Sequence, residues 1–160
     1  MQIEKLKEAL ASENIATSMS VSDEDIMFFQ SKNKVLLPKD LVKYFKHING
    51  TNEEYDNRFF RFYSLNQFKS INEELINWSG LPDYSGIVNT LKEYSSYFVI
   101  ADYSFHMFVY AIHLSNSDNY ENEVLVISGD EYKKIANSFS EFIELYFEDS
   151  LELQLNKEDS

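Results

Sequence analysis

The chain has 160 residues, the length of one ordinary domain and enough to bury about 70% of the surface that the unfolded chain exposes. Its 27 acidic and 14 basic residues give a formal net charge of −13 at pH 7, which repels nucleic-acid phosphates and anionic membranes and attracts basic proteins. The absence of cysteine excludes disulfides, thiolate metal sites and cysteine nucleophiles, and is compatible with a reducing cytoplasm.

The first third of the chain predicts three helices. Apolar residues at helical spacing predict a helix over residues 2–11. A second helix begins at a capping box, in which Asp25 answers Ser22, and ends near "SKNK". The third, in "LLPKDLVKYFKHING", carries an apolar face at i, i+3, i+4 and i+7 and ends at the left-handed stop Asn49-Gly50. These helices are expected to flank a sheet formed by the rest of the chain.

The middle of the chain predicts a strand, a helix and a loop. "RFFRFYS", residues 58–64, alternates as a strand does. "SLNQFKSINEELINW" begins with a capping box from Ser64 to Gln67 and keeps an apolar stripe at helical spacing. "SGLPDYSG" holds a proline and two glycines and is the clearest surface loop, followed by a short helix around residues 87–94.

Three further strands are predicted at 97–101, 107–114 and 124–128, where β-branched and aromatic residues gather. Their connections are too short for parallel crossovers, so they should pair as an antiparallel meander. The strand at 107–114 is apolar on both faces and is expected to be covered on both sides. A capping box from Ser138 to Glu141 then opens a last helix.

The fold class that follows is α+β. We expect a single domain, mainly an antiparallel central sheet of about four to six strands, flanked by N-terminal helices, a middle helix and a C-terminal helix. The core is expected to span about residues 22–150. The helix at 2–11 precedes this core and a frayed tail at 156–160 follows it.

A polar knot, Asp102-Tyr103-Ser104-Phe105-His106, separates the first two strands of the meander. Asp102 with His106 imitates an acid–orienter pair, but no serine in a hydrolase turn accompanies them. The three histidines of the chain are too dispersed for a metal site, and no nucleotide, phosphate, zinc or hydrolase motif occurs. The sequence therefore predicts no catalytic residue, no metal ligand and no cofactor, and a strand turn at the knot.

Carboxylates gather on connections between the predicted elements, where recognition residues concentrate. One group follows the helix stop at Asn49-Gly50, and another lies in the turn before the strand at 124–128. Side chains of the knot are expected to join them in contacting a partner. The predicted contact residues are Glu53, Glu54, Asp56, Asp102, Tyr103, His106, Asp118, Glu121 and Glu123. The alternative is a solvated acidic surface that only keeps the protein soluble.

Three stretches resemble one protein superfamily. In "LLPKDLVKYFKHING" and "RFFRFYSLNQF", the segments Leu37-Pro38, Asn49-Gly50 and Phe62-Tyr63-Ser64-Leu65 resemble the opening motif of the SUKH superfamily, which comprises the Smi/Knr cell-wall-assembly-regulator family and bacterial immunity proteins. "FVIADYSFHMFVYAIHL" resembles its central strand pair, with Asp102 at the acidic position after the first strand. "ISGDEYKKIANSFSEFIELYFED" resembles its closing segment.

The resemblance covers about residues 22–150 and departs from the family pattern at two turns. Thr51 follows Asn49-Gly50 where many members have a second glycine, and Tyr103 to His106 replace a glycine-containing strand turn. Both departures affect the shape of loops, and therefore anything that those loops bind.

The resemblance implies an α+β domain without catalysis, whose bacterial members bind and neutralise a cognate toxin, often a nuclease. The implied partner is a cognate toxin or another basic protein in the cytoplasm, with no nucleic acid and no membrane. Two alternatives stay open: a regulatory scaffold that binds a host protein, and a small ligand-binding enzyme that uses Asp102, His106 and nearby tyrosines. The sequence leaves monomer and dimer equally open.

Overall fold

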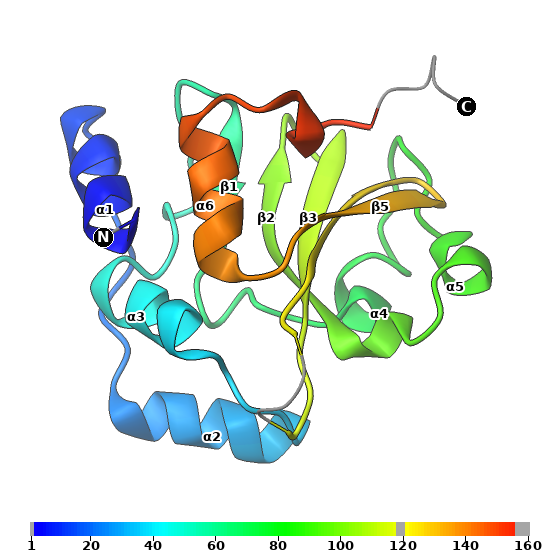
Figure 1. The fold of residues 1–160 in the computed structure, drawn as a ribbon, viewed down its shortest axis with the longest axis horizontal. Coiled ribbons are helices and arrows are strands. Elements are labelled where there is room, and N and C mark those ends of the chain that lie inside the picture. Colours follow the sequence, from blue (N-terminus) through cyan, green and yellow to red (C-terminus); the bar gives the residue numbers. More distant parts are fainter. Residues whose placement is uncertain (1, 118–120, 156–160) are drawn as a thin grey trace.

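A five-stranded antiparallel sheet forms the centre of the computed structural model, which describes residues 2–117 and 121–155 (Figure 1). The strands lie in the sheet in chain order, so each pairs with its neighbour in sequence. Their bounds are β1 Phe60–Phe62, β2 Tyr97–Tyr103, β3 Phe108–His113, β4 Val124–Ser128 and β5 Glu131–Ala136. The predicted single-domain α+β class and the antiparallel meander are confirmed.

Helices cover both faces of this sheet. The α-helices are α1 Gln2–Ser12, α2 Asp23–Asn33, α3 Lys39–His47, α4 Ile71–Glu74, α5 Ile87–Thr90 and α6 Phe139–Phe147, and the 3-10 helices are η1 Tyr94–Ser96 and η2 Leu151–Leu153. One core cluster joins α1, α2, α3 and α6 to one face of the sheet, and a second joins α4 and α5 to the other (Figure 1). Among the described helices, none combines the length and apolarity that crossing a membrane requires.

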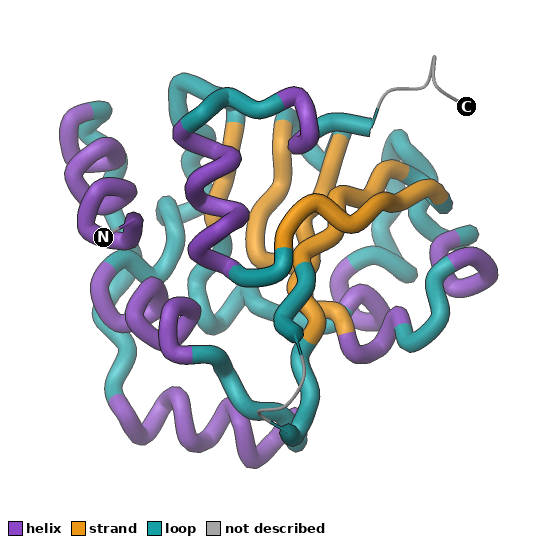
Figure 2. Tube along the Cα trace, in the orientation of Figure 1, coloured by secondary structure: helices purple, strands orange, loops and turns teal. Residues whose placement is uncertain are grey.

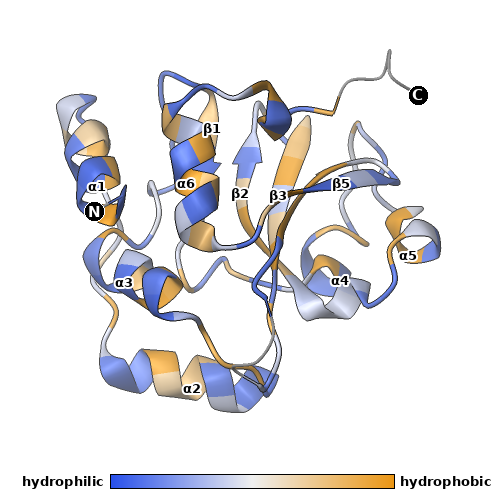
Figure 3. Ribbon diagram, in the orientation of Figure 1, coloured by the Kyte–Doolittle hydropathy of each residue, from blue (hydrophilic) through white to orange (hydrophobic). Residues whose placement is uncertain are grey.

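Strand β3 divides its side chains between the two core clusters. Phe108, Tyr110 and Ile112 enter the larger cluster, whereas Val109 and Ala111 enter the smaller one. Successive residues of a strand point to opposite faces, so a strand that is apolar at every position must be covered on both sides. Figure 3 shows this hydrophobic character along β3, and bands of both colours on the amphipathic helices α1 and α6. The prediction of a doubly covered central strand is confirmed.

Two predicted capping boxes occur at the starts of α2 and α6. At α2 the Ser22 side chain accepts from the Asp25 N–H and the Asp25 carboxylate accepts from the Ser22 N–H, so this box is confirmed. At α6 the Ser138 hydroxyl accepts from the Glu141 N–H. The Glu141 carboxylate, however, accepts from the Asn137 N–H, so only half of the predicted box forms.

The helix predicted over residues 64–78 is wrong over most of its length, because only α4 is an α-helix there. The chain before α4 runs instead beside the start of β2. The Val99 N–H donates to the Lys69 carbonyl at 2.9 Å, and Ser70 forms an isolated bridge with Phe98. Pairing with a distant strand therefore overrides the local helical pattern, and Figure 2 shows α4 and α5 as short turns within long loops.

Strand β5 is an element that the sequence analysis did not predict. Most of its residues are exposed or half-buried, so it lacks the apolar alternation that indicates a strand. It lies at the edge of the sheet and carries Lys133 and Lys134. Lysine on an edge strand discourages pairing with another chain, which gives a physical reason for this composition.

Asn49 and Gly50 end α3 as predicted, and both adopt left-handed backbone conformations. The Asn49 amide donates to the Met19 carbonyl at 2.7 Å and its oxygen accepts from the Leu65 N–H at 2.8 Å. A Cβ on Gly50 would lie 2.6 Å from the backbone nitrogen of Ser64. The turn therefore joins the N-terminal helices to β1 at a point where no side chain fits.

We expect Gly50→Ala to lower the free energy of unfolding by about 2 kcal/mol, measured by urea denaturation. The added methyl group meets both a positive φ and the backbone of residues 63–64. Gly129→Ala is the control, because Gly129 also has a positive φ but its nearest neighbouring atom would lie 3.4 Å from the new Cβ. The control should cost about 1 kcal/mol. Equal losses in the two variants would contradict the steric argument.

Candidate functional site

The structure separates the predicted contact residues between the two ends of the sheet. Tyr55 packs on Phe105 with ring centroids 4.7 Å apart, which places the loop of Glu54 and Asp56 near the hairpin that joins β2 to β3, whereas the Glu53 carboxylate lies 3.5 Å from the Gln67 amide. Glu121 and Glu123 lie toward the opposite end, where the Glu123 carboxylate accepts from the Tyr97 hydroxyl at 2.5 Å, and Asp118 lies outside the described residues. The hairpin end therefore brings most of the predicted residues together.

A β-bulge in β2 determines which way Asp102 points. The pairing of β2 with β3 shifts register between Val99 and Ala101. Ile100 and Ala101 consequently both contribute to the larger core cluster, and Asp102 pairs with Val109, a residue of the smaller cluster. A bulge commonly redirects a side chain in this way. The result is a fully buried aspartate on the face of the sheet that α4 and α5 cover.

Asp102 is the centre of a buried hydrogen-bond network. Its Oδ2 accepts from Arg61 Nε at 3.0 Å, from Arg61 Nη2 at 2.7 Å and from the Tyr63 hydroxyl at 3.0 Å. Its Oδ1 accepts from the Tyr55 hydroxyl at 2.6 Å. A buried carboxylate requires such partners, since its desolvation otherwise costs several kcal/mol. We call Asp102, Arg61, Tyr55 and Tyr63 the Asp102 network.

The surroundings raise the pKa values of three members of the Asp102 network, Tyr55, Tyr63 and Arg61. Burial, followed by the negative charges of Asp102 and Glu74, raises the pKa of Tyr63 far above its ordinary value. Burial and the hydrogen bond to Asp102 likewise raise the pKa of Tyr55. Burial alone would lower the pKa of Arg61, but its charged and polar neighbours, chiefly Asp102, outweigh that effect and raise it. The tyrosines thus remain hydroxyl donors and the arginine remains a cation at neutral pH.

His106 is held between this network and an aromatic ring. Its ring stacks on Trp78 with centroids 4.2 Å apart and planes inclined by 9°. Its Nε2 lies 3.4 Å from the Tyr63 hydroxyl, and its carbonyl accepts from the Tyr84 hydroxyl at 2.5 Å. The Asp102 Oδ2 to His106 Nδ1 distance is 3.6 Å, longer than a hydrogen bond. These contacts of His106 hold the hairpin from the protein interior. None of the three cavities described below includes Asp102 or His106 in its wall.

The backbone of the hairpin is strained. Ser104, Phe105 and His106 have φ values of 47°, 55° and 66°, and Phe59 in the neighbouring turn has a φ of 66°. The Ser104 N–H donates to the Phe59 carbonyl at 2.9 Å, so the two turns are directly joined. Left-handed conformations of residues other than glycine each cost about 1 kcal/mol or more and persist only where the surroundings enforce them. Here the contacts of His106 and the Asp102 network enforce them.

Large apolar side chains project from these two turns into solvent. Phe105 is 74% exposed, Phe59 is 59% exposed and Met107 is 49% exposed. Glu53 and Glu54 are also exposed, on the loop that precedes Tyr55. We call the set Phe59, Phe105, Met107, Glu53 and Glu54 the hairpin-end patch. It combines apolar contact area with negative charge. The backbone of the hairpin is held in place by the Asp102 network and by the contacts of His106 in the protein interior.

Several predicted contact residues are not exposed, which corrects the expectation that the acidic loop and the knot are open to solvent. Asp56 and Asp102 are buried, and so is His106. Asp56 accepts hydrogen bonds from the Arg58 and Phe60 N–H groups, both at 2.9 Å, and from the Tyr146 hydroxyl. Its role is to order the turn that leads into β1. Tyr103 is half-buried against the larger core cluster, whereas Glu53 and Glu54 are exposed.

Phe59, Phe105 and Met107 are not among the contact residues that the sequence predicts. Their one signal is an apolar side chain at a position that the flanking strands assign to a turn, since β1 starts after Phe59 and Phe105 lies between β2 and β3. Apolar residues in aromatic-rich stretches are ordinarily assigned to the core, and 16% of this chain is aromatic. The exposure of these three side chains follows from the strand pairing, which no local pattern in the sequence specifies.

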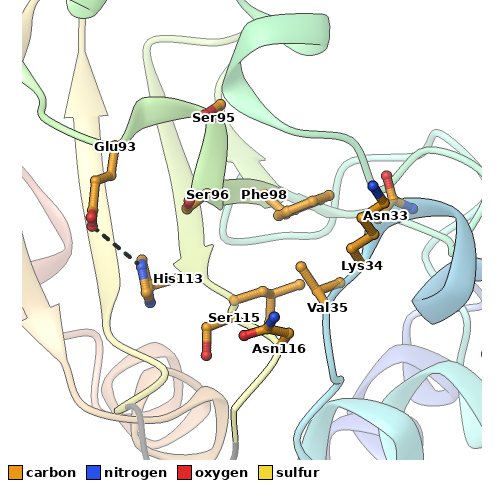
Figure 4. Close-up of a pocket in the computed structure, with 11 residues that line it drawn as sticks. Asn33, Lys34, Val35, Glu93, Ser95, Ser96, Phe98, His113, Ser115 and Asn116 are labelled. Atoms are coloured by element: carbon orange, nitrogen blue, oxygen red, sulfur yellow. Dashed lines mark ion pairs between the residues drawn. The ribbon is translucent and has the colours of Figure 1, made fainter.

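A cavity of about 330 Å³ opens at the opposite end of the sheet (Figure 4). It lies between the end of α2 and the ends of β2 and β3, and serines and asparagines form much of its wall. The Nε2 of His113 lies 3.8 Å from the Glu93 carboxylate there. In residues 2–117 and 121–155, no three histidine, aspartate or glutamate side chains come together as a metal site would require.

A larger cavity of about 570 Å³ lies between α2 and the loop that precedes α4. Met19 and Phe28, both strongly exposed, form part of its edge. Its charged wall residues are two carboxylates and two lysines: Asp25, Glu73, Lys32 and Lys69. The charges in the wall of this groove therefore cancel.

One protein-family model matches most of the chain. The model of the SMI1 / KNR4 family (SUKH-1) matches residues 20–145. That range includes α2, the complete sheet, the Asp102 network and most of α6. No curated protein matches the chain.

Proposed function

The chain belongs to the SMI1 / KNR4 family (SUKH-1), and from this premise we propose that it is a non-catalytic protein-binding module that neutralises a basic toxin by docking on it. The partner in this proposal is a cognate toxin in the cytoplasm, and a nuclease is the toxin class that fits best. A nuclease presents cations to hold the phosphates of its substrate. An anionic protein that occupies those cations blocks the substrate.

The observation that supports the proposal is the excess of carboxylates on the surface. The chain carries 27 acidic residues against 14 basic ones. At least six of the basic side chains are already in ion pairs with carboxylates in the described ranges. These cations are Lys43, Lys46, Arg58, Arg61, Lys133 and Lys134. The remaining negative charge is available to attract a cationic partner and to accelerate the encounter.

The proposal is tested by co-expression with the product of the adjacent reading frame. If that product is a toxin, this chain should restore growth and the two purified proteins should form a complex. Restored growth without a complex would contradict docking. A complex with a host protein that is not toxic, and no rescue of growth, would instead favour a regulatory scaffold.

The association rate constant of that complex should fall by at least about tenfold between low salt and about 500 mM salt, because exposed charges are screened beyond a few ångströms at high ionic strength. Stopped-flow mixing measures this rate. Glu53→Lys with Glu54→Lys should slow association more than Glu8→Lys with Glu131→Lys, which changes the net charge equally at exposed sites elsewhere. A rate that is insensitive to salt would contradict electrostatic steering.

A further inference from the structure

We infer that the hairpin-end patch is the surface that contacts the partner, and that it receives a segment of the partner that carries arginine or lysine side chains. In this arrangement the cations lie over the rings of Phe59 and Phe105 and pair with Glu53 and Glu54. The inference rests on the proposed function and adds to it the location of the interface and the chemistry of the segment that binds.

Two positions with strained backbone carry an exposed phenylalanine side chain. Phe59 and Phe105 have positive φ values, at which asparagine or glycine would be favoured over an aromatic residue. Both rings nevertheless project into solvent, where they gain little from burial in the chain itself. Backbone strain and exposed apolar area at the same residues do not serve the stability of the fold. They are typical of a site that is held ready for a partner.

Contacts within the protein fix the turn between β2 and β3 before any partner binds. The Tyr84 hydroxyl holds the His106 carbonyl, and Trp78 covers the His106 ring. Tyr55 links Asp102 to Phe105, because its hydroxyl donates to Asp102 and its ring contacts the Phe105 ring. A surface whose side chains are ordered in advance loses little conformational entropy on binding, so more of its contact energy contributes to affinity.

The hairpin-end patch carries negative charge that no lysine or arginine among the described residues neutralises. Arg58 is paired with Asp149 and Arg61 is paired with Asp102, so the two cations near the patch are already neutralised. In the described ranges, neither Glu53 nor Glu54 forms an ion pair with a lysine or arginine. The Glu53 carboxylate accepts a hydrogen bond from the Gln67 amide at 3.5 Å, which leaves its charge without a counter-ion. Exposed aromatic rings together with carboxylates that have no cationic partner favour arginine and lysine, which interact with both.

The surface beside Phe59 is concave. A cavity of about 290 Å³ opens there, with Phe59, Tyr103 and Gln154 in its wall. Binding energy at protein interfaces concentrates where a side chain of one partner enters a pocket of the other. The groove beside α2 is larger and also carries an exposed phenylalanine, Phe28, but its charged residues cancel. The charged wall residues of the cavity beside Phe59, Arg58 and Asp149, also form a pair, so the carboxylates that favour a basic partner at the hairpin end are Glu53 and Glu54 outside this cavity.

The probe for this surface is the amphipathic cationic peptide Ac-RLRLRLRL-NH2, with Ac-QLQLQLQL-NH2 as its uncharged control. Titration of the cationic peptide into isotopically labelled protein should shift amide resonances of residues 53–59 and 103–108 most strongly. Phe59→Asn with Phe105→Asn should weaken binding by about tenfold. The melting temperature of this double variant should equal or exceed that of the wild type, because asparagine tolerates a positive φ better than phenylalanine does.

Phe28→Asn is the matched variant, because Phe28 is 69% exposed but lies in a regular helix. It should leave the affinity for the cationic peptide unchanged. Shifts centred on α2, equal binding of both peptides, or a double variant that melts several degrees lower with unchanged affinity would each overturn the inference.

Growth rescue separates this inference from the proposed function. If the wild type rescues cells from the toxin and the Phe59→Asn/Phe105→Asn variant rescues them equally well, the interface is elsewhere although the function stands. If the wild type does not rescue, toxin neutralisation is wrong, and the peptide titration still decides whether the hairpin end binds cationic segments.

Discussion

Asp102→Ala is expected to lower the free energy of unfolding by about 3 kcal/mol, measured by urea denaturation at neutral pH. The substitution leaves Arg61 without its counter-ion in a site where the arginine side chain is only 21% exposed. It also removes the acceptor of the Tyr55 hydroxyl and one acceptor of the Tyr63 hydroxyl. Loss of one member of a buried ion pair costs more than the pair contributes, because the other charge stays desolvated.

A paired substitution tests that explanation. Arg61→Met with Asp102→Leu removes both charges together, and Tyr63 keeps Glu74 and His106 as neighbours. We expect the double variant to recover at least half of the stability that Asp102→Ala loses. If the double variant is as unstable as the sum of its single substitutions, the stranded arginine is not the cause. A loss below about 1 kcal/mol for Asp102→Ala would show that solvent reaches Arg61 freely.

Local signals were sufficient to predict most of the sheet and the larger helices. The strands around Val99, Val109 and Val126 are rich in β-branched and aromatic residues, and short connections allow only antiparallel pairing. Helices α2 and α6 carry a serine at the N-cap and an apolar face. In each case the information lies within about ten consecutive residues, so a pattern in the sequence captures it.

The features that build the site depend on contacts between distant residues, and no local pattern encodes them. A single bulge between Val99 and Ala101 reverses the direction of every later side chain in β2 and so turns Asp102 toward the face that α4 and α5 cover. The stacking of Trp78 on His106 depends on where the helix predicted over 64–78 is interrupted by pairing with β2. The sequence therefore predicted the hairpin between β2 and β3 but assigned the buried side chains of Asp102 and His106 to the surface.

Alkaline unfolding should be steep, because five tyrosines that are at most 2% exposed resist ionisation in the folded state. Burial is the largest cause that raises the pKa of each of them far above the ordinary value of about 10. These residues are Tyr44, Tyr63, Tyr84, Tyr110 and Tyr146. Above about pH 10 the unfolded chain releases these protons and the folded chain retains them. The folded state then binds more protons than the unfolded state, so stability is complete below this pH and falls as the pH rises.

Each such tyrosine contributes a slope of about −1.4 kcal/mol per pH unit, so five of them approach about −7 kcal/mol per unit and exceed the stability of a typical domain before pH 12. Circular dichroism and phenolate absorbance should therefore change together in one transition. Tyr110→Phe is the control, because it removes one ionising group and only the hydrogen bond to the Leu153 carbonyl. Its stability should decline less steeply with pH than that of the wild type, by the slope that one tyrosine contributes. Gradual ionisation without unfolding would mean that solvent reaches these hydroxyls in the folded protein, and the same openness would remove the physical basis for a rigid hairpin end.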